Sequence, residues 1–86
     1  MILFIMCMRD RSADVFGQPS FHLSVGGAVR GFGDEINRVD ANNVLNRHPE
    51  DFDLYQLGTY DDSDGSFNID KPRQVAIGKD LIRNGK

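Results

Sequence analysis

Three neighbouring residues, His48, Glu50 and Asp51, carry the side chains best suited to chemistry in this sequence. An imidazole and two carboxylates could bind a divalent metal ion or exchange a proton near neutral pH. A metal site normally draws ligands from a second element, yet His22 is the one other histidine, and no HxxH or HxH pattern is present. We therefore predict a turn in which a carboxylate accepts a backbone N–H, with no metal ion and no cofactor.

An acidic segment at residues 61 to 66 resembles a calcium-binding loop. If its glycine is Gly65, an EF-hand loop would need an acid at Tyr60 and a glutamate at Lys71. Both requirements fail. The segment is therefore predicted to be a solvated hairpin turn in which Gly65 supplies the positive φ.

Covalent catalysis would need a nucleophile activated by a neighbouring base. Cys7 lies in the apolar stretch of residues 2 to 8, where a thiol usually packs inertly. The Gly26-Gly27 pair lacks the lysine and hydroxyl residue of a P-loop and the spacing of a dinucleotide-binding loop. We assign no catalytic residue and predict that the protein is not an enzyme.

Basic residues expected near strand ends or in loops are the candidates for contact with nucleic acid. If they converge beside an exposed Phe16 or Tyr60, the surface would combine stacking with positive charge, as in sheet proteins that bind single strands. The alternative is a solvated surface of scattered charge. The net charge of −3 argues against indiscriminate binding to a phosphate backbone. The candidates are Arg9, Arg11, Arg47, Lys71 and Arg73.

The first half of the chain predicts two extended segments. Residues 2 to 8 are apolar on both faces, which favours a central strand covered on both sides. At about eight residues the stretch is too short to span a bilayer, so we predict no membrane association. Val15 to Leu23 forms a second extended run, whose first half is an edge or a bulge because of Gly17 and Pro19.

A helix is expected after Ser24, which can cap it. Gly31 and Gly33 lie inside this helix and each costs about 1 kcal/mol relative to alanine. Close packing of the helix on a sheet or on a second subunit could compensate for this cost. The alternative is a helix of low stability. The expected apolar face comprises Ala28, Val29, Phe32, Ile36 and Val39. Two ion pairs are expected on the wet face, namely Arg30 with Asp34 and Glu35 with Arg38.

The second half predicts a hairpin. Asp40 to Asn46 is a loop, with Asn42 and Asn43 suited to left-handed positions, and Pro49 biases His48 away from helical geometry. A strand begins at Phe52, with Leu54 and Gln56 on one side and Tyr55, Leu57 and Thr59 on the other. The returning strand carries Phe67 and Ile69, ends at Pro72, and precedes a short strand at Gln74 to Ile77.

The predicted element order is β-β-α-β-β with a possible short final strand. The fold class is α+β, a small antiparallel sheet with one helix packed on one face. The 86 residues make a single domain, 1–86, with a core of about 2–78 and a frayed tail at 82–86. The second face of the sheet would expose apolar residues to solvent if nothing covered it. We therefore predict a homodimer or higher oligomer that covers this face.

The order of these features resembles the small non-structural protein of gokushoviruses, single-stranded DNA phages of the Microviridae. The resemblance covers roughly residues 2 to 70, and its most specific part runs from His48-Pro49-Glu50-Asp51 through Phe52-Asp53-Leu54. The other matching segments are the strand ending in Asp10, Phe16-Gly17-Gln18-Pro19-Ser20-Phe21, Gly27-Ala28-Val29-Arg30-Gly31-Phe32, Leu57-Gly58, and Tyr60-Asp61-Asp62 with Gly65 at the turn.

This resemblance implies a non-enzymatic viral accessory protein made in the host bacterial cytoplasm. It further implies a part in replication or packaging of the genome, with single-stranded DNA as the expected partner. The alternative is a protein-interaction module that binds a viral or host replication protein without touching DNA. The resemblance supplies no catalytic residues.

Overall fold

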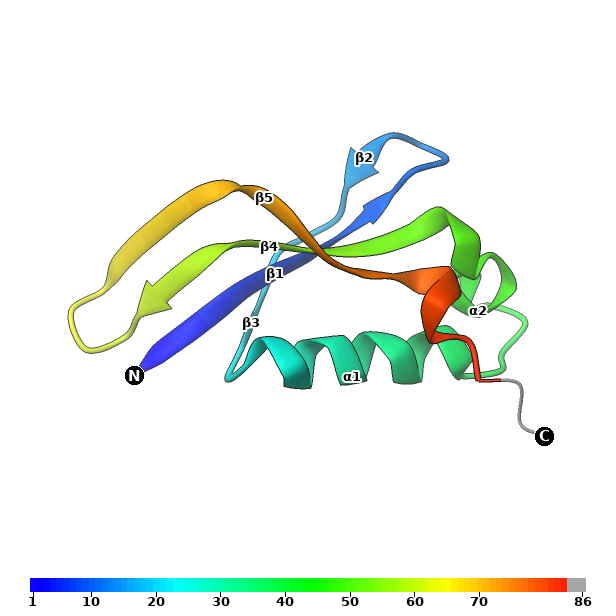
Figure 1. Cartoon of the computed structure of the whole chain (residues 1–86), viewed down its shortest axis with the longest axis horizontal. Coiled ribbons are helices and arrows are strands. Elements are labelled where there is room, and N and C mark those ends of the chain that lie inside the picture. Colours follow the sequence, from blue (N-terminus) through cyan, green and yellow to red (C-terminus); the bar gives the residue numbers. More distant parts are fainter. Residues whose placement is uncertain (84–86) are drawn as a thin grey trace.

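The computed structural model describes residues 1–83 and shows a curled antiparallel sheet with one long helix along one face (Figure 1). The predicted α+β class is confirmed. The strand order is β2-β1-β4-β5, and β3 pairs with β1 on the same side as β2. The strands are β1 (Ile2–Asp10), β2 (Val15–Phe16), β3 (Ser20–His22), β4 (Phe52–Asp61) and β5 (Ser66–Ile77).

The strand β1 is the centre of the sheet, as its apolar sequence predicts. Ile5, Met6 and Cys7 are all buried. Met6 belongs to the core beneath the helix, whereas its neighbours point to the opposite face because side chains alternate along a strand. The extended run after β1 is interrupted between β2 and β3, which confirms the irregular edge expected from Gly17 and Pro19.

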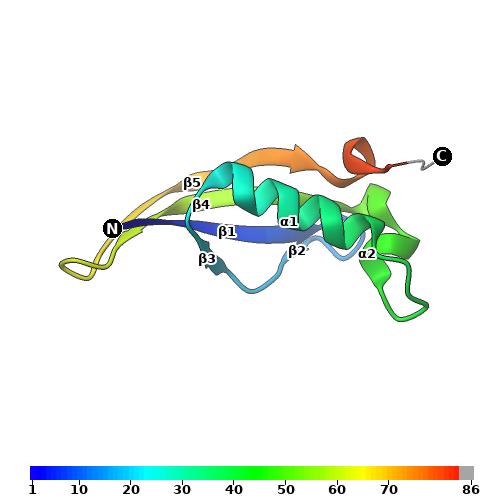
Figure 2. The same ribbon diagram turned by 90° about the horizontal axis from the view of Figure 1, so that it is seen from below.

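The helix α1 (Val25–Asn37) packs along the sheet, as Figure 2 shows from below. Its cap is the predicted one, since the Gly27 N–H donates to Ser24 Oγ at 2.9 Å. Val39 was expected on the buried face but is 88% exposed, because the helix ends at Asn37 and the next residue is extended. The core cluster comprises Met6, Ala28, Phe32, Ile36, Leu45, Phe52 and Leu54.

The two glycines inside α1 have different surroundings. Gly33 is buried, and a Cβ there would lie 3.7 Å from the side chain of Leu81 in the 3₁₀ helix η2 (Gly78–Leu81). Gly33 thus packs against a segment of the same chain, but at an ordinary van der Waals distance that an alanine Cβ would also satisfy, so this packing does not require glycine. A Cβ at Gly31 would meet nothing within 4 Å, so packing does not explain that residue.

The ion pairs of α1 were predicted correctly in one case of two. Glu35 binds Arg38 at 2.6 Å, and the pKa of the Glu35 carboxyl is lowered by hydrogen bonds from that guanidinium. Asp34 instead binds Arg83 at 2.9 Å, and the Arg83 N–H donates to Asn37 Oδ1 at 2.7 Å. Of the tail expected to fray, 82–86, Arg83 thus makes contacts with α1, and residues 84–86 lie outside the described residues.

The connection from α1 to β4 is more ordered than the loop that was predicted. It contains the short helix α2 (Val44–Arg47) and the 3₁₀ helix η1 (Pro49–Asp51). Asn43 has a φ of −96° rather than a left-handed conformation. Its side-chain oxygen caps α2, while its amide donates to the carbonyls of Glu35 and Arg38, and this double capping overrides the turn preference of asparagine.

The β4–β5 hairpin is irregular in the middle. Gln56 is opposite Met6 and Gly58 is opposite Ile5, so Leu57 is an extra residue in β4. This bulge puts Thr59 on the face of Gln56, and the expected sharing of a face with Tyr55 was wrong. Pro72 does not end the return strand, because β5 is an edge strand in which a missing donor is tolerated. The predicted short final strand is the end of β5.

Candidate functional site

Aromatic side chains gather on the sheet face opposite α1. The register places Phe16 beside Arg9, Phe21 beside Ile5 and Tyr55 beside Cys7, all odd-numbered positions of β1 that point away from the helix. Tyr60 is paired with Leu3 on one side and with Phe67 on the other. We call this surface the aromatic face, made of Phe16, Phe21, Tyr55, Tyr60 and Phe67.

The rings of the aromatic face form two groups. Phe16 contacts Tyr55 edge to face, with ring centroids 5.2 Å apart. Tyr60 contacts both Phe67 at 4.8 Å and Phe21 at 5.7 Å. The three phenylalanines remain 41–59% exposed. Large exposed rings fixed on a rigid sheet offer stacking surfaces to flat partners, such as nucleobases.

Arg9 is the predicted basic residue that lies on the aromatic face. Its guanidinium carbon is 5.8 Å from the centroid of the Phe16 ring, and the side chain also binds the carboxylate of Asp14. The hydrogen bond that Arg9 donates to the Asp14 carboxylate raises the pKa of the Arg9 guanidinium, with a smaller contribution from Tyr55. A permanent cation therefore stands beside a ring at one end of the face.

Arg11 has a structural role instead. Its Nε lies 3.2 Å from Asp53 Oδ2, its guanidinium donates to the carbonyl of Glu50, and its backbone N–H donates to the carbonyl of Asp51 at 2.8 Å. Asp53 is only 1% exposed, and the side-chain amide of Gln74 donates a hydrogen bond to the same carboxylate oxygen at 3.1 Å. Arg11 thus joins the turn before β4 to a buried charge inside β4.

The remaining basic candidates lie elsewhere. Lys71 and Arg73 line a small cavity beside the bulge of β4, and Arg73 donates to Gln56 Oε1 at 2.6 Å. Arg47 is exposed at the end of α2. The five candidates therefore do not converge into one groove. They occupy four separate places in the fold, since only Lys71 and Arg73 lie together, and Arg9 alone among them is in the aromatic face.

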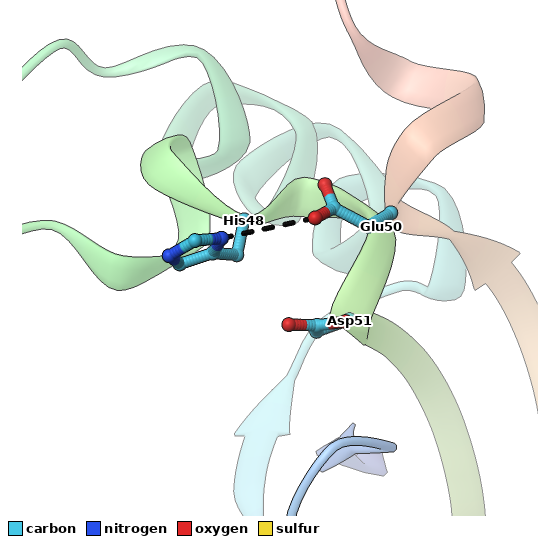
Figure 3. A group of neighbouring side chains, drawn as sticks. All are labelled: His48, Glu50 and Asp51. Atoms are coloured by element: carbon cyan, nitrogen blue, oxygen red, sulfur yellow. Dashed lines mark ion pairs between the residues drawn. The ribbon is translucent and has the colours of Figure 1, made fainter.

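Figure 3 shows His48, Glu50 and Asp51, whose potential ligand atoms all lie within 4.8 Å of one another. His48 Nδ1 is 3.7 Å from Glu50 Oε2, and both side chains are at least half exposed. The turn is held by the Asp51 N–H, which donates to the His48 carbonyl at 3.0 Å, rather than by a carboxylate as predicted. Two exposed side chains and one half-buried side chain from a single turn do not by themselves define a metal site.

The predicted turn at Gly65 is confirmed. Gly65 has a φ of +76° and lies between β4 and β5, and its N–H donates to the carbonyl of Asp61 at 2.8 Å. The Asp61 carboxylate accepts from the Ser63 hydroxyl and backbone N–H, and these bonds lower the pKa of Asp61. The acidic segment is thus a hairpin turn in which Asp61 and Asp64 accept hydrogen bonds locally, while Asp62 pairs with the N-terminal amine of Met1 at 2.9 Å.

Sequence reasoning named Phe16 and Tyr60 but missed Phe21, Tyr55 and Phe67 as parts of one surface. Two signals were available. Phe21 alternates with polar neighbours, which marks it as a one-sided strand position. A hairpin turn at Gly65 brings Tyr60 and Phe67 opposite one another. Tyr55 could not be assigned to the same face as Tyr60 from sequence, because the bulge between them changes the alternation of β4.

Comparison with known proteins supplies the family context. Residues 3–81 match the family described as Phage ORF5 protein. The chain is 35% identical over 71 residues to Protein ORF5 of Chlamydia phage 1, which covers 78% of this chain and 72% of that protein. No solved structure matches. The expected relationship to the small proteins of gokushoviruses is confirmed. No helix in residues 1–83 has the length and apolarity needed to cross a membrane.

Proposed function

The chain belongs to the Phage ORF5 protein family, and on that premise we propose that it is a non-enzymatic phage accessory protein that binds single-stranded DNA. Binding would serve genome replication or packaging in the cytoplasm of the infected bacterium. The observation that carries this proposal is the aromatic face. Phe16, Phe21 and Phe67 remain exposed on a sheet surface that α1 leaves uncovered.

The chemistry of the face favours stacking over charge. Base stacking on aromatic side chains contributes about 1–3 kcal/mol per base and accepts any sequence. Arg9 adds one cation beside Phe16, whereas Asp61, Asp62 and the rest of the acidic turn lie at the opposite end of β1. We therefore expect modest affinity with a shallow dependence on salt, since few phosphates are neutralised. This is compatible with a net charge of −3.

Removing single rings tests the proposal. Phe21→Ala and Phe67→Ala are each expected to weaken binding of a fluorescent oligothymidylate of about 15 nucleotides by about 1–3 kcal/mol, because each removes a stacking surface. The measurement is fluorescence anisotropy at low salt. Val39→Ala is the matched control, since Val39 is exposed outside α1 and away from the face. Equal affinity of the ring variants and the control would contradict the assignment.

A second proposal is favoured by the edge of β5. Residues Ser66 to Gln74 of this edge strand are exposed, and an exposed edge can accept a strand from a viral or host replication protein or from a second copy of the chain. Lys71 and Pro72 interrupt the edge, so pairing would be confined to Ser66 to Asp70. A dimer mass by light scattering without affinity for the oligonucleotide would favour this proposal over the first.

A further inference from the structure

The β4–β5 pair contains an irregularity that the aromatic face does not use. Gln56 is opposite Arg73, while Gly58 is opposite Ile69, so the single residue Leu57 faces three residues of β5, and β5 has two residues more than β4 at this point. The strands separate there and leave a cavity of about 200 Å³. It is lined by Gln56, Gly58, Asp70, Lys71 and Arg73.

The lining of this cavity is polar and carries one net positive charge, from Lys71 and Arg73 against Asp70. Arg73 is held in place, because its guanidinium donates to Gln56 Oε1 at 2.6 Å. No ion pair joins Asp70 to either cation within residues 1–83. A guanidinium already oriented by a neutral partner retains further donors for an oxyanion.

The size of the cavity limits the ligand. Pockets that enclose whole small molecules have volumes of about 300–1,000 Å³, so about 200 Å³ suits a single polar group. Gly58 allows the backbones of β4 and β5 to approach closely beside the cavity, because a Cβ there would clash with the carbonyl oxygen of Asn68. The two cations, Lys71 and Arg73, stand two positions apart on β5, and arginine and lysine are the side chains that commonly bind phosphate groups.

We propose that this cavity, which we call the bulge pocket, binds a phosphate group, and that the group is a phosphodiester of single-stranded DNA. The identity of the source rests on the proposed function. Phe67 precedes Lys71 by four residues in β5, which corresponds to at most about 13 Å along a strand. A single strand whose bases stack on Tyr60 and Phe67 can therefore cross the β5 edge and place a phosphate in the bulge pocket.

Nuclear magnetic resonance can distinguish binding at the bulge pocket from binding at the aromatic face. The reporters are the chemical shifts of the backbone amides of Gly58 and Lys71. Inorganic phosphate, thymidine 5′-monophosphate and oligothymidylate are titrated separately into the full chain. We expect all three to shift the two amides. Lys71→Ala and Arg73→Gln should each weaken the phosphate response and oligonucleotide affinity about tenfold, because each removes a charge-assisted hydrogen bond. Lys79→Ala, an exposed lysine in η2, is the control.

The other outcomes overturn the inference in distinguishable ways. If the oligonucleotide binds but leaves Gly58 and Lys71 unshifted, the proposed function stands and the bulge pocket is not a phosphate site. If inorganic phosphate shifts the amides but the oligonucleotide does not bind, the phosphodiester assignment and the proposed function both fail, and the pocket takes a free phosphate. If no titrant has any effect, both proposals fail.

Discussion

Replacing Arg11 with methionine is expected to lower the free energy of unfolding by about 3 kcal/mol. The substitution keeps much of the length of the side chain but leaves the carboxylate of Asp53, only 1% exposed, with Gln74 as its remaining partner. Breaking a buried ion pair from one side typically costs about 3–5 kcal/mol. Because the Arg11 side chain is itself 45% exposed, the lower end of that range applies. Urea denaturation measures the change.

Two further variants isolate the cause. Arg47→Met removes an exposed arginine from α2 and should change stability by less than about 0.5 kcal/mol. The double variant Arg11→Met with Asp53→Asn should recover part of the loss, because an amide costs less to bury than an unpaired carboxylate. A single Arg11→Met variant as stable as the parent would show that the pair with Asp53 contributes little. Arg11 is consequently a poor choice for testing DNA contact.

Replacing Gly58 with alanine is expected to lower the free energy of unfolding by about 2–4 kcal/mol, because the strain of the backbone adds to a steric clash. Gly58 has a φ of +156°, and a Cβ there would lie 2.2 Å from the carbonyl oxygen of Asn68. Relieving that contact would require β4 and β5 to separate. Thermal unfolding followed by circular dichroism measures the loss.

Gly31→Ala is the matched control for Gly58→Ala. A Cβ at Gly31 would meet nothing within 4 Å, so the helix propensity of alanine should stabilise the protein by up to about 1 kcal/mol. The two alanine variants should thus move stability in opposite directions. If Gly58→Ala were as stable as the parent, the bulge and the register around it would be wrong, and the bulge pocket would lose its basis.

The parts of the fold that were predictable from sequence are those set by local signals. The apolar run of β1 identifies the central strand, Ser24 identifies the start of α1, and Gly65 identifies the hairpin turn. Each depends on the chemistry of a few adjacent residues: burial on both faces, a hydroxyl that accepts from Gly27, and a positive φ.

The features that could not be predicted depend on contacts between distant residues. The bulge at Leu57 follows from how β4 registers against β1 and β5, and it alone reverses the face of Thr59. The role of Arg11 depends on Asp53, far along the chain, and no local pattern indicates that pair. The helix α1 ends at Asn37, which leaves Val39 exposed. This end depends on the side-chain amide of Asn43, which donates to the carbonyl of Arg38.

The sequence predicted that the candidate site combines aromatic and basic residues, but not which of these residues lie together. Sequence reasoning combined basic and aromatic residues, and the structure keeps Arg9 with Phe16 while placing Lys71 and Arg73 beside the bulge. Charged residues give weak signals of position, because they are tolerated in most exposed places. Aromatic residues in strands give stronger signals, since their alternation reports a face, provided that no bulge interrupts it.

The central claim is that bases stack on the aromatic face, and intrinsic tyrosine fluorescence tests it most directly. The chain contains two tyrosines and no tryptophan, and both tyrosines, Tyr55 and Tyr60, lie on that face. Titration with unlabelled oligothymidylate at low salt should quench their emission in a saturable manner, and Phe67→Ala should shift the midpoint to higher concentration. Tyrosine emission that stays unchanged up to a large excess of oligonucleotide would contradict the claim.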